Sequence, residues 1–121
     1  MKNKARYAVQ NGVVFIEDEK GGEPPDQSND DMVKYTSSCI SVACLHEIDG
    51  EAEFTLGPSD EVDPGYEASF DGEIETPTKK LVITSVEENK ILKAEVPDII
   101  TRVRVWCNHP LWADQVVVGW A

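Results

Sequence analysis

Residues 100–107 read "ITRVRVWC", and residues 114–120, one short loop later, read "DQVVVGW". From residue 102 to residue 107, arginine or tryptophan alternates with valine or cysteine. Side chains two residues apart point to the same face of a β-strand, so this alternation predicts a strand with one buried face and one exposed face. The second stretch has the β-branched residues of a further strand. The residue pattern of these two stretches therefore predicts a β protein.

The same two-residue period recurs along most of the chain. It is found in the runs "NGVVFIE" (11–17), "SSCISVACLHEI" (37–48), "EAEFTL" (51–56), "YEASFDGEIE" (66–75), "KKLVITSV" (79–86) and "KILKAEV" (90–96). Asp49-Gly50 is typical of a hairpin turn, and Glu87-Glu88-Asn89 of a tight turn. No stretch keeps a helical pattern for three turns. We predict an all-β fold, a single-domain antiparallel β-sandwich of about eight short strands in two sheets.

The length of 121 residues favours one domain, residues 1–121. Residues 17–31, "EDEKGGEPPDQSNDD", combine a glycine pair, a proline pair and many acids, and we expect an exposed acidic loop there. "DDMVKY" follows, and Asp30 or Asp31 is a possible N-cap. We therefore expect a short helical turn at that point.

Charge and cysteine content limit the classes of partner. The formal net charge is −12, which repels nucleic acid and anionic lipid and attracts a basic partner. The sequence has neither an apolar run of about 18 residues nor a signal-peptide core, so we expect no membrane span and no secretory signal. Three cysteines without a pairing pattern are typical of a reducing, cytoplasmic location. Cys39 and Cys44 lie in an apolar run and are predicted to be small core residues.

The densest charge lies in residues 46–78, which contain eleven carboxylates and no lysine or arginine. Strand alternation would place Glu67, Asp71, Glu73 and Glu75 on one side of a strand. Glu51 and Glu53 would share a face of the preceding strand, and like charges would stand opposite one another if the two strands were neighbours. Three interpretations remain open: a solvated face that prevents aggregation, a docking surface for a basic partner, or a calcium site. The spacing of an EF-hand is absent, and we predict no metal.

No motif points to catalysis. The sequence lacks a phosphate-binding loop, HExxH and GxSxG, and Cys107 with His109 is too small a set for zinc. We predict a binding protein with no catalytic residue and no cofactor. Trp112 lies in the predicted loop "NHPLW" and is a candidate anchor, because tryptophan is enriched in interface hot spots. The candidate partner-binding residues are Glu47, Asp49, Glu51, Glu53, Asp60, Glu61, Asp63, Glu67, Asp71, Glu73 and Trp112.

Three segments resemble the competence protein J family, whose best-known member inhibits a nuclease involved in DNA entry. The first is "YAVQNGVVFIED" with the acidic Pro-containing loop "GGEPPD". The second is "CISVACL", which precedes the acidic stretch. The third is "VRVWCNHPLWADQVVVGW", a strand ending in tryptophan, a Pro-containing loop and a valine-rich strand. The same features are typical of immunity proteins that neutralise nuclease toxins.

The resemblance implies an inhibitor or immunity protein that blocks a basic partner, a nuclease or a nuclease toxin. A strand face with Glu51, Glu53, Glu67, Asp71 and Glu73 would replace phosphate in the cleft of that enzyme, through bidentate arginine–carboxylate bonds. The loop carboxylates would reach the active-site metal or its basic neighbours; they are Asp60, Glu61 and Asp63. Alternatives are a phage-type DNA mimic that blocks a DNA-binding complex, a small hydrolase, and a calcium-binding β-domain.

Overall fold

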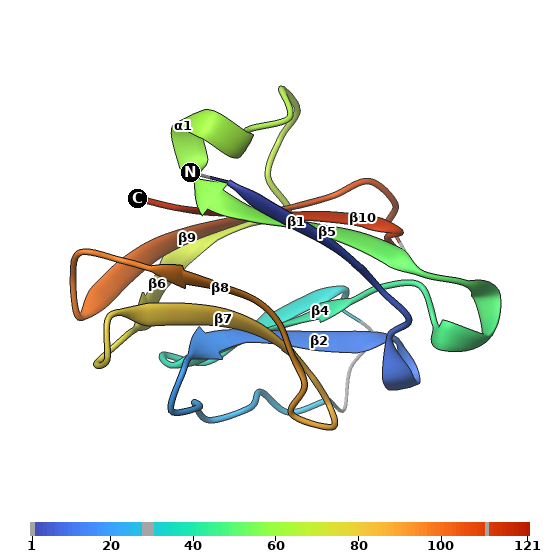
Figure 1. The fold of residues 1–121 in the computed structure, drawn as a ribbon, viewed down its shortest axis with the longest axis horizontal. Coiled ribbons are helices and arrows are strands. Elements are labelled where there is room, and N and C mark those ends of the chain that lie inside the picture. The colour runs from blue at the N-terminus through green and yellow to red at the C-terminus, as the bar shows by residue number, and fades with distance from the viewer. Residues whose placement is uncertain (1, 28–30, 111) are drawn as a thin grey trace.

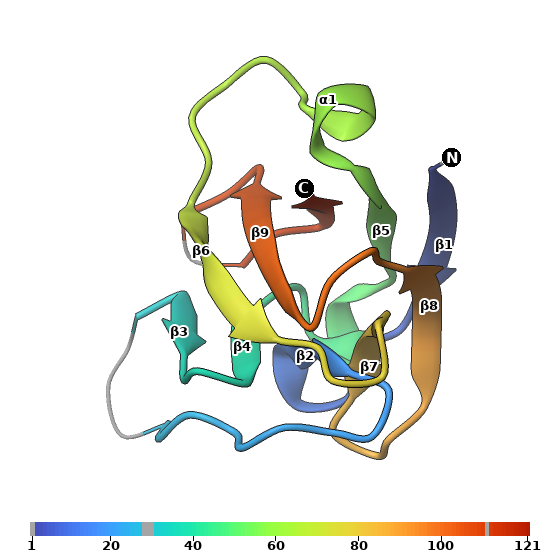
Figure 2. The same ribbon diagram turned by 90° about the vertical axis from the view of Figure 1, so that its left-hand side faces the viewer.

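The computed structural model describes residues 2–27, 31–110 and 112–121, and within these ranges it has ten strands in two sheets (Figures 1 and 2). The first sheet has the order β1 (Asn3–Tyr7), β5 (Ala52–Pro58), β10 (Gln115–Trp120), β9 (Ile100–Cys107), β6 (Phe70–Glu75). The second has the order β3 (Val33–Tyr35), β4 (Cys39–Ala43), β2 (Val13–Asp18), β7 (Lys80–Ser85), β8 (Lys90–Glu95). Helical structure is limited to η1 (Gln10–Gly12), η2 (Glu47–Asp49) and α1 (Ser59–Val62).

The predicted all-β fold is confirmed: a strand overlaps each of the eight predicted runs, and β1 and β3 are added. The run 66–75 becomes a strand only from Phe70, so the prediction that Glu67 lies on the same strand face as Asp71 is wrong. The helical turn predicted at "DDMVKY" is wrong: Val33–Tyr35 form β3, which pairs with β4. Of its two proposed caps, Asp30 lies outside the described residues, and Asp31 precedes the strand. Strand pairing satisfies more backbone groups than one capped turn would. Every described strand pair is antiparallel except β5 with β10, which is parallel.

The hairpin predicted at Asp49-Gly50 is also wrong. β4 belongs to the second sheet and β5 to the first, so the chain changes sheets at this point (Figure 1). The 3-10 turn η2 carries the crossing, and Gly50 ends it with φ of 131°, a conformation that favours glycine. The same turn residues serve a hairpin and a crossover, so their presence alone did not distinguish the two.

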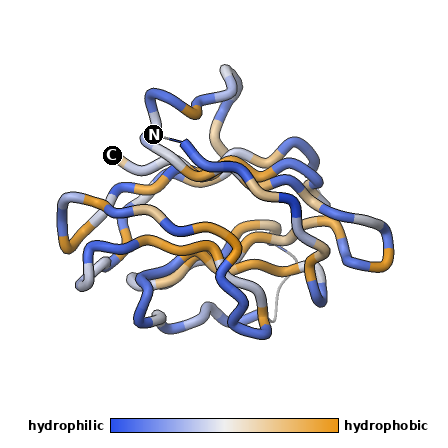
Figure 3. Tube along the Cα trace, viewed as in Figure 1, coloured by the Kyte–Doolittle hydropathy of each residue, from blue (hydrophilic) through white to orange (hydrophobic). Residues whose placement is uncertain are grey.

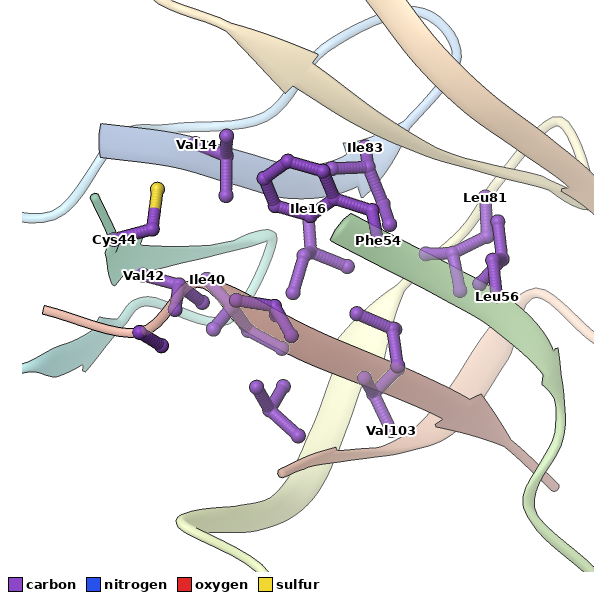
Figure 4. Packing of buried hydrophobic residues seen from close by; sticks show 14 of the residues in the cluster. Val14, Ile16, Ile40, Val42, Cys44, Phe54, Leu56, Leu81, Ile83 and Val103 are labelled. Carbon is purple, nitrogen blue, oxygen red and sulfur yellow. The ribbon is translucent and has the colours of Figure 1, made fainter. Parts of the chain in front are cut away.

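The core lies between the sheets, where the inward faces of both are apolar (Figures 3 and 4). Phe54 and Val103 of the first sheet meet Ile16, Ile40 and Ile83 of the second, and all five are fully buried. Each such side chain contributes roughly 1.5–3 kcal/mol on burial. This packing holds the two sheets in one fixed relation.

Both predicted core cysteines are buried, and burial raises the pKa of each thiol to about 12. Cys44 belongs to the core between the sheets. Cys39 instead pairs with Glu17 across β4 and β2, and its sulfur lies 3.9 Å from the Glu17 carboxylate. Glu17 is only half-buried, so Cys39 lies on the other side of the second sheet.

The Gly/Pro loop begins later than predicted, because Glu17 and Asp18 complete β2. Asp18 is buried, and its carboxylate accepts hydrogen bonds from the backbone N–H and the hydroxyl of Thr78. The loop then runs along the second sheet: Gly22 lies so close to Ser38 that a Cβ there would be 2.1 Å from its carbonyl oxygen, and Pro25 is buried. Among the described residues, no helix has the length and apolarity that a membrane span requires.

Candidate functional site

The outer face of the first sheet carries predicted binding residues on two of its strands, β5 and β6. Glu53 of β5 points outward between the buried Ala52 and Phe54, and Asp71 and Glu73 of β6 alternate with inward side chains. β10 and β9 separate these two strands. The prediction that like charges stand opposite one another was conditional on β5 and β6 being neighbours, and they are not.

Arginines from distant parts of the sequence lie between these carboxylates. Arg6 of β1 lies opposite Glu53, 4.0 Å from its carboxylate and 3.5 Å from that of Glu51. Arg102 of β9 donates two hydrogen bonds to Asp71, at 2.9 and 2.7 Å, and Arg104 lies 3.3 Å from the same carboxylate. The hydrogen bonds and charge of Arg102, with Arg104, lower the pKa of Asp71. The face is therefore mixed in charge, although the acidic stretch contains no base.

A short arch rises from this face, formed by α1 and residues 63–69 (Figures 1 and 2). The indole N–H of Trp106 donates to the Tyr66 carbonyl at 3.0 Å, which ties the arch to β9. Gly119 of β10 allows α1 to approach, because a Cβ there would lie 2.7 Å from the Ser59 hydroxyl oxygen and 2.9 Å from the Ser59 Cα. The arch presents four carboxylates and no lysine or arginine; they are Asp60, Glu61, Asp63 and Glu67.

Two shallow hollows flank the arch. One, of about 190 Å³, is lined by Lys4 and Glu53 on the β1–β5 side. The other, of about 290 Å³, lies between Glu67 and Arg104 on the β6–β9 side. Carboxylates at the rims can accept charge-assisted hydrogen bonds from lysine or arginine. The structure thus gathers eight of the predicted residues on one face: Glu51, Glu53, Asp60, Glu61, Asp63, Glu67, Asp71 and Glu73.

The other three predicted residues lie at one end of the sandwich. Glu47 and Asp49 belong to η2, and Trp112 lies in the β9–β10 loop. Trp112 is 49% exposed, and its indole stacks on the His109 ring with centroids 3.9 Å apart. Trp106, by contrast, is buried, but under the arch rather than between the sheets. The eleven predicted residues therefore form two groups.

The described residues contain no group of three or more His, Cys, Asp and Glu side chains arranged to hold a metal. Burial raises the pKa of the Glu17 carboxyl, which lies beside Cys39. A thiol with a pKa of about 12 remains protonated at neutral pH, and the thiol form is a poor nucleophile. Glu17 and Cys39 thus do not form an activated nucleophile and base.

The fold has counterparts among solved structures. No family model matches the chain, and no curated protein matches it. Two solved structures share the fold. ComJ from Bacillus subtilis, an inhibitor of the DNA-degrading activity of NucA, has 13% sequence identity and a TM-score of 0.70, with 99% of this chain and 93% of ComJ covered. The product of crocagin biosynthetic gene J has 13% identity and a TM-score of 0.56, with 99% and 97% covered. The fold resemblance predicted from the sequence is therefore found over almost the whole chain.

Proposed function

We propose that this protein is an inhibitor that binds a basic nuclease and blocks it, without catalysis of its own. The observation that carries the proposal is the arch on the outer face of the first sheet, which presents four carboxylates and no lysine or arginine. The likeness in fold to a nuclease inhibitor supports it. A nuclease cleft binds phosphate and is therefore basic, so carboxylates at fixed positions would compete with DNA for the same lysines and arginines.

The arch carboxylates are the best placed to enter such a cleft, because the arch stands out from the sheet (Figure 2) and all four of its acidic residues are exposed. Asp71 is engaged by Arg102 and Arg104, so we assign it a positioning role on the sheet. Glu51, Glu53 and Glu73 would contact the basic rim of the partner. A long-range negative field would also raise the association rate. The cytoplasm is the proposed location.

The test is an inhibition assay against nucleases that a pull-down with this protein recovers from its native host. The triple reversal of Glu51, Glu53 and Glu73 to lysine should weaken inhibition by about a hundredfold or more, since close interfacial charge pairs are worth several kcal/mol. The structure predicts no gain in stability from this change, because Arg6 and Arg102 already lie opposite Glu53 and Glu73. Circular dichroism melting checks that the variant remains folded.

A matched control separates the surface from the overall charge. Reversal of Glu23, Glu87 and Glu95, three exposed acids of the second sheet and its loops, changes the net charge by the same amount. This control should inhibit almost normally. If the two triple variants lose inhibition equally, only the net charge matters and not its place on the surface. That result would contradict the proposal. Binding to a DNA-binding complex in place of the nuclease would instead identify a DNA mimic.

A further inference from the structure

A groove opens at the end of the sandwich that carries Trp112. Its volume is about 820 Å³, and the second sheet, η1, η2 and the β9–β10 loop contribute to its lining. The apolar part of its wall is formed by Val13, Ala43, Cys44 and Leu45. Trp112 also lines the groove. η1 and η2 lie side by side at this end (Figure 1). The groove is separate from the arch and its two hollows, whose lining residues are different.

Backbone hydrogen bonds preform the base of this groove. The Cys44 N–H donates to the Gly12 carbonyl at 2.8 Å, the Leu45 N–H to the Ala113 carbonyl at 2.8 Å, and the Glu47 N–H to the Val9 carbonyl at 2.9 Å. These bonds join β4 and η2 to chain segments on both sides. A site that is already ordered loses little conformational entropy when it binds.

Two large apolar side chains are exposed at this end. Trp112 is 49% exposed, and Ile48 of η2 is 84% exposed. Trp112 is held in place: its backbone N–H donates to His109 Nδ1 at 3.2 Å, and its ring stacks on the imidazole. The Ile48 N–H donates in the same way to His46 Nδ1, at 3.1 Å. An exposed aromatic side chain held in one orientation, as Trp112 is, is typical of a protein-binding surface.

The charge around the groove limits the class of molecule that can bind in it. The residues that line the groove include the carboxylate of Asp49 and no lysine or arginine. Glu47 lies on the same 3-10 turn as Asp49, and Asp114 follows Ala113, whose carbonyl accepts the Leu45 N–H. Anionic lipid and nucleic acid would be repelled here. A second copy of this chain, also with a net charge of −12, would be repelled as well.

We propose that this groove binds one large aliphatic or aromatic side chain of a partner protein, on a surface segment where lysines and arginines flank it. The apolar walls and Trp112 bury that side chain, and Glu47, Asp49 and Asp114 pair with its basic neighbours. The inference rests on the proposed function only in assigning this segment to the nuclease. Binding at the groove would then add a specific anchor to the charge attraction of the arch.

The experiment uses the full chain, labelled with ¹⁵N, and the short peptide acetyl-Lys-Arg-Gly-Phe-Gly-Lys-Arg-amide. Addition of the peptide should change the chemical shifts of a few N–H groups most. These are the backbone amides of Leu45, His46, Ile48 and Asp49 and the indole N–H of Trp112. A peptide with serine in place of phenylalanine should bind about tenfold more weakly or worse, because burial of an aromatic side chain is lost. A peptide with glutamates in place of the basic residues should not bind at millimolar concentration.

Two variants test the groove itself. Trp112→Ala should weaken binding of the phenylalanine peptide by about tenfold or more. Ile100→Ala is the matched control, because Ile100 is 53% exposed at the other end of β9, and it should have no effect. Equal binding of the phenylalanine and serine peptides, shifts confined to the arch, or no binding would overturn the proposal. So would self-association that produces the same shifts without peptide.

The nuclease assay distinguishes this failure from failure of the proposed function. If the chain inhibits the nuclease and Trp112→Ala inhibits equally well with an unchanged dissociation rate, the groove proposal is wrong and the proposed function stands. If the chain inhibits no nuclease but the phenylalanine peptide binds at the groove, the groove proposal stands for another basic partner.

Discussion

Asp71 shows how the surroundings of a residue change its role. The sequence places it among carboxylates, whereas the structure places it between Arg102 and Arg104 of the neighbouring strand. Its two carboxylate oxygens accept hydrogen bonds from Nε and Nη2 of Arg102, which is the bidentate geometry that arginine favours. Because the residue is well exposed, solvent screening keeps its contribution to stability small. Its main effect is to orient the two arginines on the outer face.

Asp71→Asn should lower the melting temperature slightly at neutral pH, and the difference from the parent should vanish in acid. The pKa of Asp71 is lower in the folded protein than in the unfolded chain, where it is about 3.9. The stabilisation is therefore present above that value and is lost as the pH falls through the folded pKa. Melting followed between pH 7 and pH 2 checks this, with Asp60→Asn on α1 as the control. A difference that persists at pH 2 would mean that the amide disrupts packing.

The arch is the element on which the proposed function depends. It is short, and its position is determined by contacts with two strands: the Trp106 hydrogen bond on β9 and the close approach of Ser59 to Gly119 on β10. Val62, 7% exposed, supplies its buried apolar contact. Because a four-residue helix has no stability of its own, tertiary contacts hold these carboxylates in place.

Gly119→Ala should displace the arch and weaken inhibition. The added Cβ would lie within 3.0 Å of Ser59 atoms, and overpacking of this kind typically costs about 1–3 kcal/mol. Urea unfolding and the inhibition constant should therefore both change. Ser59→Ala is the control: its hydroxyl is buried and has no hydrogen-bond partner among the described residues, so its removal should leave stability unchanged or raise it. Full inhibition by Gly119→Ala would show that the arch tolerates the shift, or that the partner binds elsewhere.

At the scale of the whole molecule, the net charge of −12 is distributed over a small, rigid sandwich. The described ion pairs lie at the surface, where each contributes little. Repulsion among the remaining carboxylates acts over a longer range and opposes the folded state. Salt should therefore weaken repulsion more than it weakens the pairs.

The melting temperature should consequently rise between about 10 mM and about 0.5 M sodium chloride, as the screening length falls from about 30 Å to a few Å. Differential scanning calorimetry measures this. The triple lysine variant of Glu23, Glu87 and Glu95 carries less net negative charge and should show a smaller rise. A fall in melting temperature with salt would mean that the attractive surface pairs outweigh the repulsion.

The sequence by itself determined the fold class and eight of the strands, because alternation of apolar and polar residues is a local property that each strand carries. It also determined that carboxylates would line the outward face of β6, since the period of two assigns each residue to a side. Only the tertiary structure decided which strands are neighbours. In the tertiary structure β5 and β6 are not neighbours, and Arg6 and Arg102 lie beside the acidic residues. The chain at Asp49-Gly50 crosses between the sheets, where the sequence predicted a hairpin. Local pattern cannot specify such pairings, because they arise from packing between segments far apart in the chain.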